Sequence, residues 1–462
     1  MAGPGLGFVA KTLCSNVFLG RYTVEQALAD IPDEPITRLI RTRVDRENSR
    51  VTASVPLVAK REAVYREGWG CTLVSDDGSV AAMPAIALAK SSPDSGALWP
   101  EGERIDTTTA ADPCIDRGRL DAAIDNAFAE PNPALLRNTR AIVVVHNGRI
   151  IAERYADGYS AENRFPGWSM TKSVTSALVG VMAGEGRLAL QDSALRAEWR
   201  TPGDRRNGIR LDDLLHMSSG LDFDESYTAT GGATRMLFDS HDSDDVAAAS
   251  AIAYEPGTHW LYSSGTTNII VQYMRDRIGN DSLYFSFPRT ALFDRIGMQS
   301  AVIEPDPSGT FVGSSFMHAT ARDWARFGLL YLRDGVWNGQ RILPEGWVHY
   351  SRTPAPAAPR GQYGAQWWLN AGTAADSTDR PWPDLPRDIF YASGFQGQHV
   401  VVVPSHDLVV VRLGVTHNDR AWSLGGFLRD VLAAVCPSSS HDAVVAHGRV
   451  ASSRRARSVA AH

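Results

Sequence analysis

The chain has 462 residues, of which 44% are hydrophobic and 21% are charged, which is the composition of an ordinary globular protein. This length accommodates one large domain with extensions, or two domains. The net charge of −6 gives no general attraction to nucleic acid or to an anionic membrane, so we expect no nucleic-acid partner. No run of residues approaches the length of an apolar membrane span.

The first part of the chain, residues 1–112, is predicted to be an N-terminal extension that ends in a linker. Its expected elements are a helix and two strands, over Val24–Ala29, Arg50–Leu57 and Gly68–Val74. Ser91 to Asp112 is rich in Ser, Pro, Asp, Gly and Thr, which is linker composition. We therefore place a domain boundary near Pro113.

The region 113–436 is predicted to be one domain that begins with a helix, Asp116–Glu130. Two strands follow, Arg140–His146 and Arg149–Tyr155. They flank Asn147-Gly148, a dipeptide that favours the tight turn of a β-hairpin. Glu153 in the second strand is interpreted as a solvated carboxylate rather than a catalytic one, as are Asp222 and Asp224.

Helices dominate the middle of this domain, and strands return at its end. The expected helices cover Arg210–Leu221, Ala247–Ala253, Asn268–Ile278, Ala321–Leu332 and Ala421–Val435, and the late strands cover Gln398–Val403 and Leu408–Leu413. The late strands should join the early ones in one antiparallel sheet, with the inserted helices as a separate lobe. This α/β (α+β) architecture would place a ligand site in the cleft between sheet and lobe. Residues 437–462 are predicted to form a disordered tail.

Ser169 and Lys172 form a Ser-x-x-Lys motif at the start of a further predicted helix. Pro166 and Gly167 end the preceding segment, and apolar residues then recur at helical spacing. The spacing places Lys172 one turn beyond Ser169 on the same face. A serine hydroxyl needs a base to become a nucleophile, and a lysine whose pKa is lowered by burial can be that base. The motif is short enough to occur by chance, so other residues must decide its meaning.

The cysteines and the acidic residues give no sign of a metal or a cofactor. Cys14, Cys71, Cys114 and Cys436 form no Cys-x-x-Cys pair, and no His/Cys/Asp cluster has zinc-ligand spacing. No glycine-rich phosphate loop follows a strand. The cysteine spacing permits disulfides but does not fix their connectivity, and four unrelated thiols are an equal alternative.

Three further motifs follow Ser169-Met170-Thr171-Lys172 in the chain. They are Leu214-Leu215-His216-Met217-Ser218-Ser219-Gly220-Leu221, Tyr262-Ser263-Ser264 and Ala392-Ser393-Gly394. In this order they resemble the Ser-x-x-Lys, Leu-Leu-x-His-x-Ser-Gly-Leu, Tyr-x-Asn and Lys-Thr-Gly motifs of the serine β-lactamase-like family. That family includes class C β-lactamases, DD-peptidases, esterases and 6-aminohexanoate-dimer (nylon oligomer) hydrolases. The resemblance runs from about Asp116 to Val435 and implies a β-lactamase/transpeptidase-like fold.

The resemblance also implies roles. Ser169 would be the nucleophile, Lys172 its base, and Tyr262 a second proton shuttle whose pKa is lowered by the lysine. The backbone N–H groups of Ser169 and Phe395 would form the oxyanion hole. His216 is expected to be structural, capping or bridging loops behind the site. The substrate would contact Trp168, Ser264, Ser393, Gly394 and Gln396.

Two departures from the family pattern concern the substrate. Ser264 replaces the asparagine that orients the substrate amide in β-lactamases, and Ala392 replaces the cationic residue that receives the antibiotic carboxylate. The sequence is therefore most similar to the nylon oligomer hydrolases and esterases, which implies hydrolysis of a small amide or ester. The alternatives are a DD-peptidase or β-lactamase, and a catalytically weak peptidoglycan- or ligand-binding protein.

Relatives with a leader similar to Lys11-Thr12-Leu13-Cys14-Ser15 often carry an apolar export or anchor segment before it. Here only Phe8-Val9-Ala10 stands in that place, so a membrane anchor is expected only if the true start lies upstream. The resemblance implies a periplasmic or membrane-associated bacterial protein with Cys14 paired to Cys71, since oxidising conditions let such a bond persist. A cytoplasmic protein is the alternative. The sequence predicts no particular oligomeric state.

Overall fold

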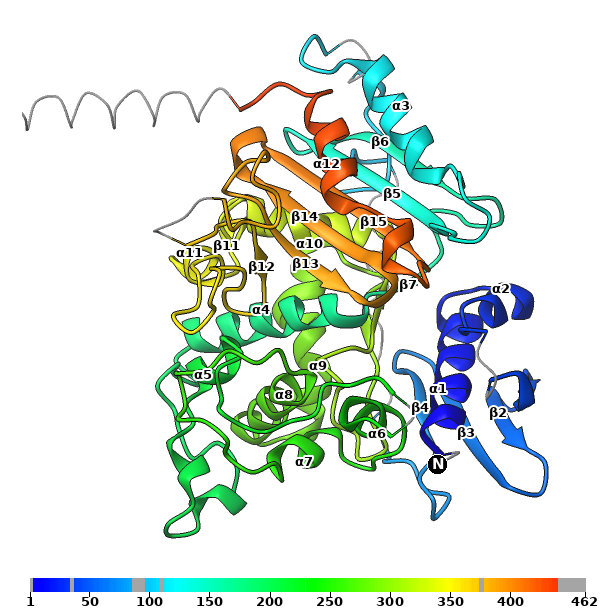
Figure 1. Ribbon diagram of the computed structural model, residues 1–462, viewed down its shortest axis with the longest axis vertical. Coiled ribbons are helices and arrows are strands. Elements are labelled where there is room, and N and C mark those ends of the chain that lie inside the picture. The colour runs from blue at the N-terminus through cyan, green and yellow to red at the C-terminus, as the bar shows by residue number, and fades with distance from the viewer. Residues whose placement is uncertain are drawn as a thin grey trace, which may run out of the picture.

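The computed structural model describes residues 3–33, 37–84, 96–108, 112–228, 230–373 and 378–438. Its largest sheet has six antiparallel strands in the order β12-β13-β14-β15-β5-β6 (Figure 1). Their bounds are β5 Thr139–His146, β6 Arg149–Tyr155, β12 Trp368–Leu369, β13 Phe390–Gly394, β14 Gln398–Val403 and β15 Leu408–Gly414. Val410 of β15 lies opposite Val144 of β5, so the prediction that late and early strands share one sheet is confirmed.

The predicted hairpin between β5 and β6 is also confirmed. Asn147 and Gly148 both have left-handed backbone angles, with φ of 50° and 71°. Two successive residues of this kind form the turn whose twist matches the twist of the strands beside it.

Helices cover both faces of this sheet, which explains why its strands are nearly continuous runs of valine and isoleucine. In Figure 1, α3 (Arg117–Phe128) and α12 (Leu424–Leu432) lie in front of the sheet, and α10 (Ala321–Leu332) lies behind it. Val144, Val401 and Val410 pack with α3 and α12. Their neighbours Val143, Val400 and Val409 point the other way and pack with Trp324 and Phe327 of α10.

The helical lobe occupies the middle of the chain, as predicted. It contains α4 Thr171–Gly184, α5 Leu211–Leu215, α6 Gly232–Phe238, α7 Ser243–Ala248, α8 Ser264–Ile278 and α9 Asp281–Pro288. Figure 1 shows α4 between the sheet and the other helices of the lobe. The remaining short elements are α11 Trp347–Ser351, β7 Phe165–Pro166, β8 Val302–Ile303, β9 Met317–Ala319, β10 Val336–Trp337 and β11 Gln340–Arg341.

Local contacts explain where the helix bounds differ from the prediction. α8 begins at Ser264, earlier than predicted, because the Ser263 hydroxyl accepts a hydrogen bond from the Thr266 N–H and caps the helix there. α7 ends at Ala248, and Ile252 instead forms a β-bridge with Leu221. The helix predicted over Ala321–Leu332 is confirmed at both ends.

The N-terminal extension contains more structure than the sequence predicted. Helix α1 (Gly3–Cys14) packs on a four-stranded antiparallel sheet of β1 (Arg41–Asp45), β2 (Arg50–Val55), β3 (Ala59–Arg66) and β4 (Gly70–Leu73). The predicted helix α2 (Val24–Ala29) is present. Helix α1 was missed because glycine and proline at its start are poor helix formers. Helix α1 is instead stabilised by the burial of Leu6, Val9 and Leu13.

Gly7 shows why one of those glycines is needed. A Cβ atom at this position would lie 1.9 Å from the carbonyl oxygen of Phe238, at the end of α6. Only glycine lets α1 approach the helical lobe so closely, so the residue that weakens the helix signal also joins the extension to the lobe.

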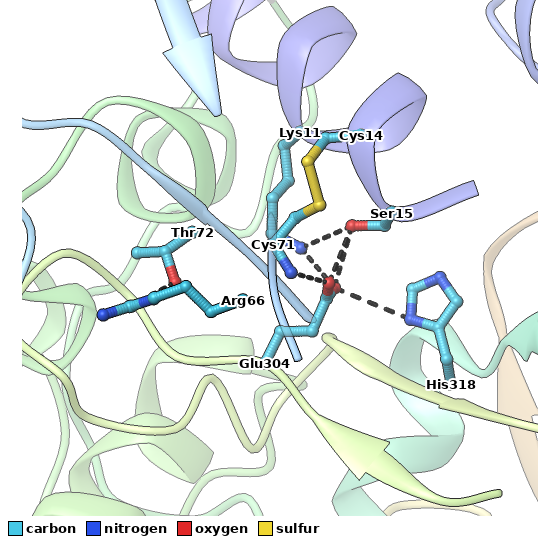
Figure 2. The surroundings of a disulfide bond; sticks show 8 residues. All are labelled: Lys11, Cys14, Ser15, Arg66, Cys71, Thr72, Glu304 and His318. Atoms are coloured by element: carbon cyan, nitrogen blue, oxygen red, sulfur yellow. Dashed lines mark hydrogen bonds and ion pairs between the residues drawn. A yellow bond between two sulfur atoms is a disulfide. The ribbon is translucent and has the colours of Figure 1, made fainter. Parts of the chain in front are cut away.

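The disulfide between Cys14 and Cys71 is present, as expected, and a buried ionic cluster lies beside it (Figure 2). The Glu304 carboxylate accepts hydrogen bonds from the Cys71 N–H at 2.6 Å, from the Ser15 hydroxyl at 2.9 Å and from the Lys11 ammonium. Lys11 and Glu304 are both buried. The extension is therefore fixed to the rest of the chain by a buried charge pair that hydrogen bonds complete.

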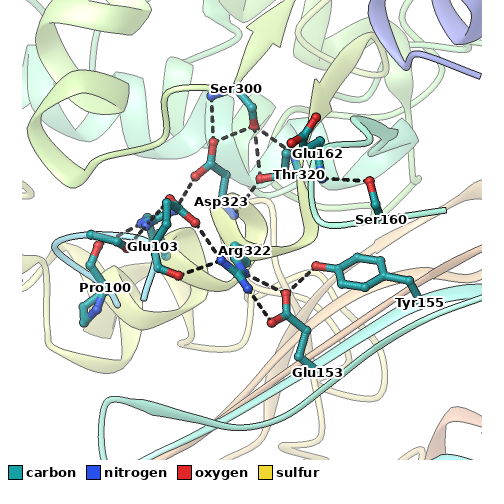
Figure 3. A network of polar contacts seen from close by, with 12 residues as sticks. Pro100, Glu103, Glu153, Tyr155, Ser160, Glu162, Ser300, Thr320, Arg322 and Asp323 are labelled. Carbon is teal, nitrogen blue, oxygen red and sulfur yellow. Dashed lines mark hydrogen bonds and ion pairs between the residues drawn. The ribbon is translucent and has the colours of Figure 1, made fainter. Parts of the chain in front are cut away.

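The expectation that Glu153 is solvated is wrong. Its carboxylate forms a two-pronged ion pair with Arg322 of α10, with both N–O distances at 2.7 Å, and accepts a hydrogen bond from Tyr155 (Figure 3). Arg322 also binds the carbonyl of Glu103, so the segment 96–108 covers the strand that carries Glu153. No local pattern in the residues around Glu153 indicates that this face of β6 is covered.

Most of the predicted tail, residues 439–462, and parts of the predicted linker, residues 85–95 and 109–111, lie outside the described residues. In the part of the chain that the structure describes, no helix has both the length and the apolar character needed to cross a membrane.

Candidate active site

Ser169 lies in a tight turn that leads into α4, as the sequence predicted. The turn covers Trp168–Met170 and is followed directly by Thr171, the first residue of α4. Trp168 has a φ of 47°, a left-handed conformation that is unusual for a bulky residue. Surrounding contacts hold it there, because its ring packs against Phe8 of the extension and Phe395 of the sheet. Strained backbone of this kind is often found at functional sites.

Lys172 is placed to act on Ser169. Its Nζ lies 3.1 Å from Ser169 Oγ, 2.9 Å from Ser264 Oγ and 3.0 Å from the carbonyl oxygen of Ser314. The residue is only 1% exposed. Burial lowers the pKa of Lys172 to about 8, and the Glu225 carboxylate partly opposes this effect. A substantial fraction of the amine is therefore neutral slightly above neutral pH, and the neutral amine can accept a proton.

Tyr262 is close to both residues, but its titration differs from the expectation. Its ring centre lies 4.9 Å from Lys172 Nζ, and its hydroxyl interacts with Ser169, which lowers the pKa of the phenol. Burial raises the pKa of Tyr262, and the Glu225 carboxylate raises it further. The expected lowering by the lysine is not found: desolvation of the phenolate is the largest effect, and the lowering effect comes from Ser169. The phenol therefore stays protonated at neutral pH and can donate a hydrogen bond.

Glu225 is a residue that the sequence did not single out. Its carboxylate accepts hydrogen bonds from the Ser264 N–H and the Ser264 hydroxyl, both at 2.6 Å, and from the Tyr227 hydroxyl at 3.0 Å. Glu225 stands in an acidic loop, and the adjacent Asp222 and Asp224 are exposed, as expected. Only the fold distinguishes Glu225, because α8 presents the backbone of Ser264 to it.

The end of β13 lies against the turn that carries Ser169. A Cβ atom on Gly394 would lie 2.1 Å from the carbonyl oxygen of Gly167, so glycine is required for this approach. Phe395 follows, with a ring that is 48% exposed and nearly parallel to the ring of Tyr227 at 6.3 Å. The backbones of Ser169 and Phe395 are thus brought to the same place.

The other predicted substrate-contact residues do not all face Ser169. Gln396 is buried, and its amide donates a hydrogen bond to the carbonyl oxygen of Asp30 in the extension. Ser264 is also buried, between Lys172 and Glu225. Ser393 lies within the β13–β14 ladder opposite His399.

His216 has the structural role that was expected. It ends α5, its Nδ1 lies 3.2 Å from the Asp212 carboxylate, and its ring packs against Tyr350. These contacts cap α5 and join it to α11.

One group of carboxylates could in principle hold a metal ion. Oxygen atoms of Asp242, Asp244 and Asp306 lie within 4.8 Å of one another. Arg196 forms an ion pair with Asp244, and the Ser243 hydroxyl and N–H bind Asp306. These partners account for two of the three carboxylates, and we assign no metal to the group.

Comparison with solved structures shows the same fold in hydrolases. The chain matches a family VIII carboxylesterase with a TM-score of 0.53 and 14% identity, over 69% of this chain and 96% of the other. It matches a D-stereospecific amidohydrolase from Streptomyces sp. with a TM-score of 0.51 and 15% identity, over 70% of this chain and all of the other.

At the sequence level the chain is similar to the 6-aminohexanoate-dimer hydrolase of Paenarthrobacter ureafaciens. The two are 25% identical over 365 residues, which cover 72% of this chain and 87% of the relative. The family model described as Beta-lactamase matches residues 134–419, which is more than half of the chain. With Ser169 and Lys172 inside the matched region, the chain belongs to the beta-lactamase family of serine hydrolases.

Proposed function

We propose that this protein hydrolyses a small amide or ester through an acyl-enzyme on Ser169. The observation that carries the proposal is the contact between Lys172 Nζ and Ser169 Oγ, at 3.1 Å, in a site where burial lowers the pKa of Lys172 to about 8. A hydroxyl beside a base that is partly neutral at working pH is what nucleophilic catalysis requires.

The first half of the reaction uses three side chains. Neutral Lys172 takes the proton of Ser169 as Oγ attacks the substrate carbonyl carbon. The protonated Lys172 and the phenol of Tyr262 then pass a proton to the departing nitrogen or oxygen, which leaves as a neutral amine or alcohol. Water next attacks the acyl group, gives a proton to the same pair of residues, and releases the acid and free Ser169.

Backbone groups would stabilise the negative charge that develops on the carbonyl oxygen. The N–H groups of Ser169 and Phe395 are proposed as its two donors. The close approach of Gly394 to Gly167 supports this assignment, because it brings the two backbone segments together.

The charges around the site favour a neutral or cationic substrate over an anionic one. Ala392, at the position where relatives with antibiotic substrates carry a cation, is only 1% exposed and offers no charge. Glu225 adds a carboxylate near Lys172. The exposed ring of Phe395, beside Trp168, supplies an apolar surface, and Ser393 and Gly394 lie on the adjoining strand. The relative that acts on the 6-aminohexanoate dimer supports an amide substrate.

A substrate panel tests this proposal. Short-chain p-nitrophenyl esters and 6-aminohexanoyl amides without a free carboxylate should have a higher kcat/KM than nitrocefin or D-Ala-D-Ala peptides, because nothing at position 392 binds the carboxylates of the latter two. Initial rates measured with one enzyme preparation give the ranking, with Ser169→Ala as the blank. Efficient nitrocefin turnover would contradict the proposal and favour a β-lactamase.

Glu225→Gln is expected to move the pH profile rather than abolish activity. The Glu225 carboxylate raises the pKa of Lys172, so its neutralisation should lower that pKa and shift the rising limb of kcat/KM to lower pH. Glutamine still has an oxygen that can accept the hydrogen bonds from Ser264. Asp222→Asn, a change to an exposed carboxylate in the same loop, is the matched control and should leave the limb in place. An unchanged limb in Glu225→Gln would show that this carboxylate does not act on Lys172.

A further inference from the structure

The two cysteines outside the Cys14–Cys71 disulfide lie beside each other. Cys114 precedes α3, and Cys436 follows α12. Ile115, the residue after Cys114, and Val435, the residue before Cys436, form an antiparallel β-bridge. The Cys436 N–H donates to the Cys114 carbonyl at 3.0 Å, and the Asp116 N–H donates to the Ala434 carbonyl at 2.9 Å. This bonding pattern places Cys114 directly opposite Cys436.

Opposed residues of an antiparallel pair are close enough for a disulfide. The Cys114 N–H binds Asp112 Oδ1 at 2.9 Å, so one backbone hydrogen bond joins the two cysteines. Directly opposed Cα atoms are about 4.5–5.5 Å apart in antiparallel pairs, within the about 4.4–6.8 Å that disulfides span. The Cys436 thiol interacts with the Cys114 thiol and raises its pKa, so the two side chains lie near each other. Both residues are partly exposed, so a small oxidant can reach them.

We propose that Cys114 and Cys436 form a second disulfide, made by exchange with a low-molecular-weight disulfide such as oxidised glutathione. In the first step one cysteine sulfur bonds to a glutathione sulfur, and one reduced glutathione leaves. In the second step the other cysteine sulfur attacks the protein sulfur of that mixed disulfide, and a second glutathione leaves. The two thiols lose two protons and two electrons, and one oxidised glutathione becomes two reduced molecules.

The position of this bond would let it stabilise the helices that cover the large sheet. It joins the start of α3 to the end of α12, the two helices that cover one face of the large sheet. Cys114 and Cys436 also stand at the two ends of the region that holds the sheet and the helical lobe. The bond would therefore hold the start of α3 and the end of α12 to each other over the sheet. This effect does not depend on the chemistry at Ser169. All four cysteines would then be paired, as suits an oxidising compartment.

Peptide mapping tests the proposal on the full chain. The protein is equilibrated in a glutathione redox buffer, denatured, alkylated with iodoacetamide and digested without reduction. We expect a peptide pair linked through Cys114 and Cys436, and a fall in free thiols from two per chain to none. Formation should be faster above neutral pH, since the pKa of Cys114 is raised and the thiolate is the attacking form.

The Cys14–Cys71 peptide pair in the same digest is the internal control, because it shows that disulfides survive the procedure. Cys114→Ser should lose the new pair and leave one free thiol, at Cys436. The oxidised protein should also have a higher Tm than the Cys114→Ser, Cys436→Ser double variant, and a thiol reductant at a concentration that spares Cys14–Cys71 should remove the difference. Alkylated Cys114 and Cys436, or separate glutathione adducts on each, beside an intact Cys14–Cys71 pair would overturn the proposal.

Discussion

Ser169→Ala is expected to remove both covalent labelling and turnover. A fluorophosphonate probe should label the wild-type protein at Ser169 and leave the variant unlabelled, because the only atom lost is the attacking Oγ. The kcat for the best ester should fall by roughly 10³-fold or more, as it does when a serine hydrolase loses its nucleophile. Intact-protein mass spectrometry measures the labelling, and initial rates measure kcat.

A serine on the same helix provides the control for this experiment. Ser176 of α4, one turn beyond Lys172, is buried and donates a hydrogen bond to the carbonyl oxygen of Ala365. Ser176→Ala should still be labelled, and its Tm shows what the loss of a buried hydroxyl from α4 does to stability. Equal labelling of wild type and Ser169→Ala would exclude Ser169 as the nucleophile.

Lys172→Arg should lower kcat/KM by at least about 10²-fold, the usual lower range for loss of a general base. Arginine keeps the positive charge but does not give up its proton. In the wild-type protein, kcat/KM should rise with pH through an apparent pKa of about 8, because the neutral amine is the active form and its fraction grows above the pKa. A free lysine titrates near pH ~10.4, so the lower pH at which kcat/KM rises would measure how far burial lowers the pKa of Lys172.

Packing damage is the other possible cause of a loss in Lys172→Arg, and two further variants separate it from loss of the base. Lys172→Met removes the amine with little change in volume and should lose a similar factor. Lys60→Arg changes an exposed lysine and should leave the profile unaltered. Near-normal turnover in Lys172→Arg would mean that the lysine supplies only charge.

The parts of the fold that follow from periodicity and turn chemistry could be predicted from the sequence. The hairpin at Asn147-Gly148 and the helix over Ala321–Leu332 carry their own local signals. Helix α1 does not, because its stability comes from Leu6, Val9 and Leu13 packing on a sheet whose strands the sequence marked only in part.

The candidate site divides in a similar way. Ser169, Lys172 and Tyr262 stand in recognisable motifs, and the structure brings them together. The role of Glu225 depends on its contact with the first residue of α8, which is a tertiary contact that local sequence does not predict. The direction of the Tyr262 pKa shift could not be predicted either, because it depends on how much water burial removes and on the nearby Glu225.

The way the extension is fixed to the rest of the chain has a consequence for synthesis on the ribosome. Lys11 and Ser15 emerge before their partner Glu304, which follows all the helices of the lobe, α4 to α9, in the chain. The Phe238 carbonyl that faces Gly7 also comes late. A short helix rich in glycine is unstable without such partners. Helix α1 can pack on β2 and β3 soon after they are translated, but its contacts with the helical lobe and with Glu304 form only once residues made much later are available.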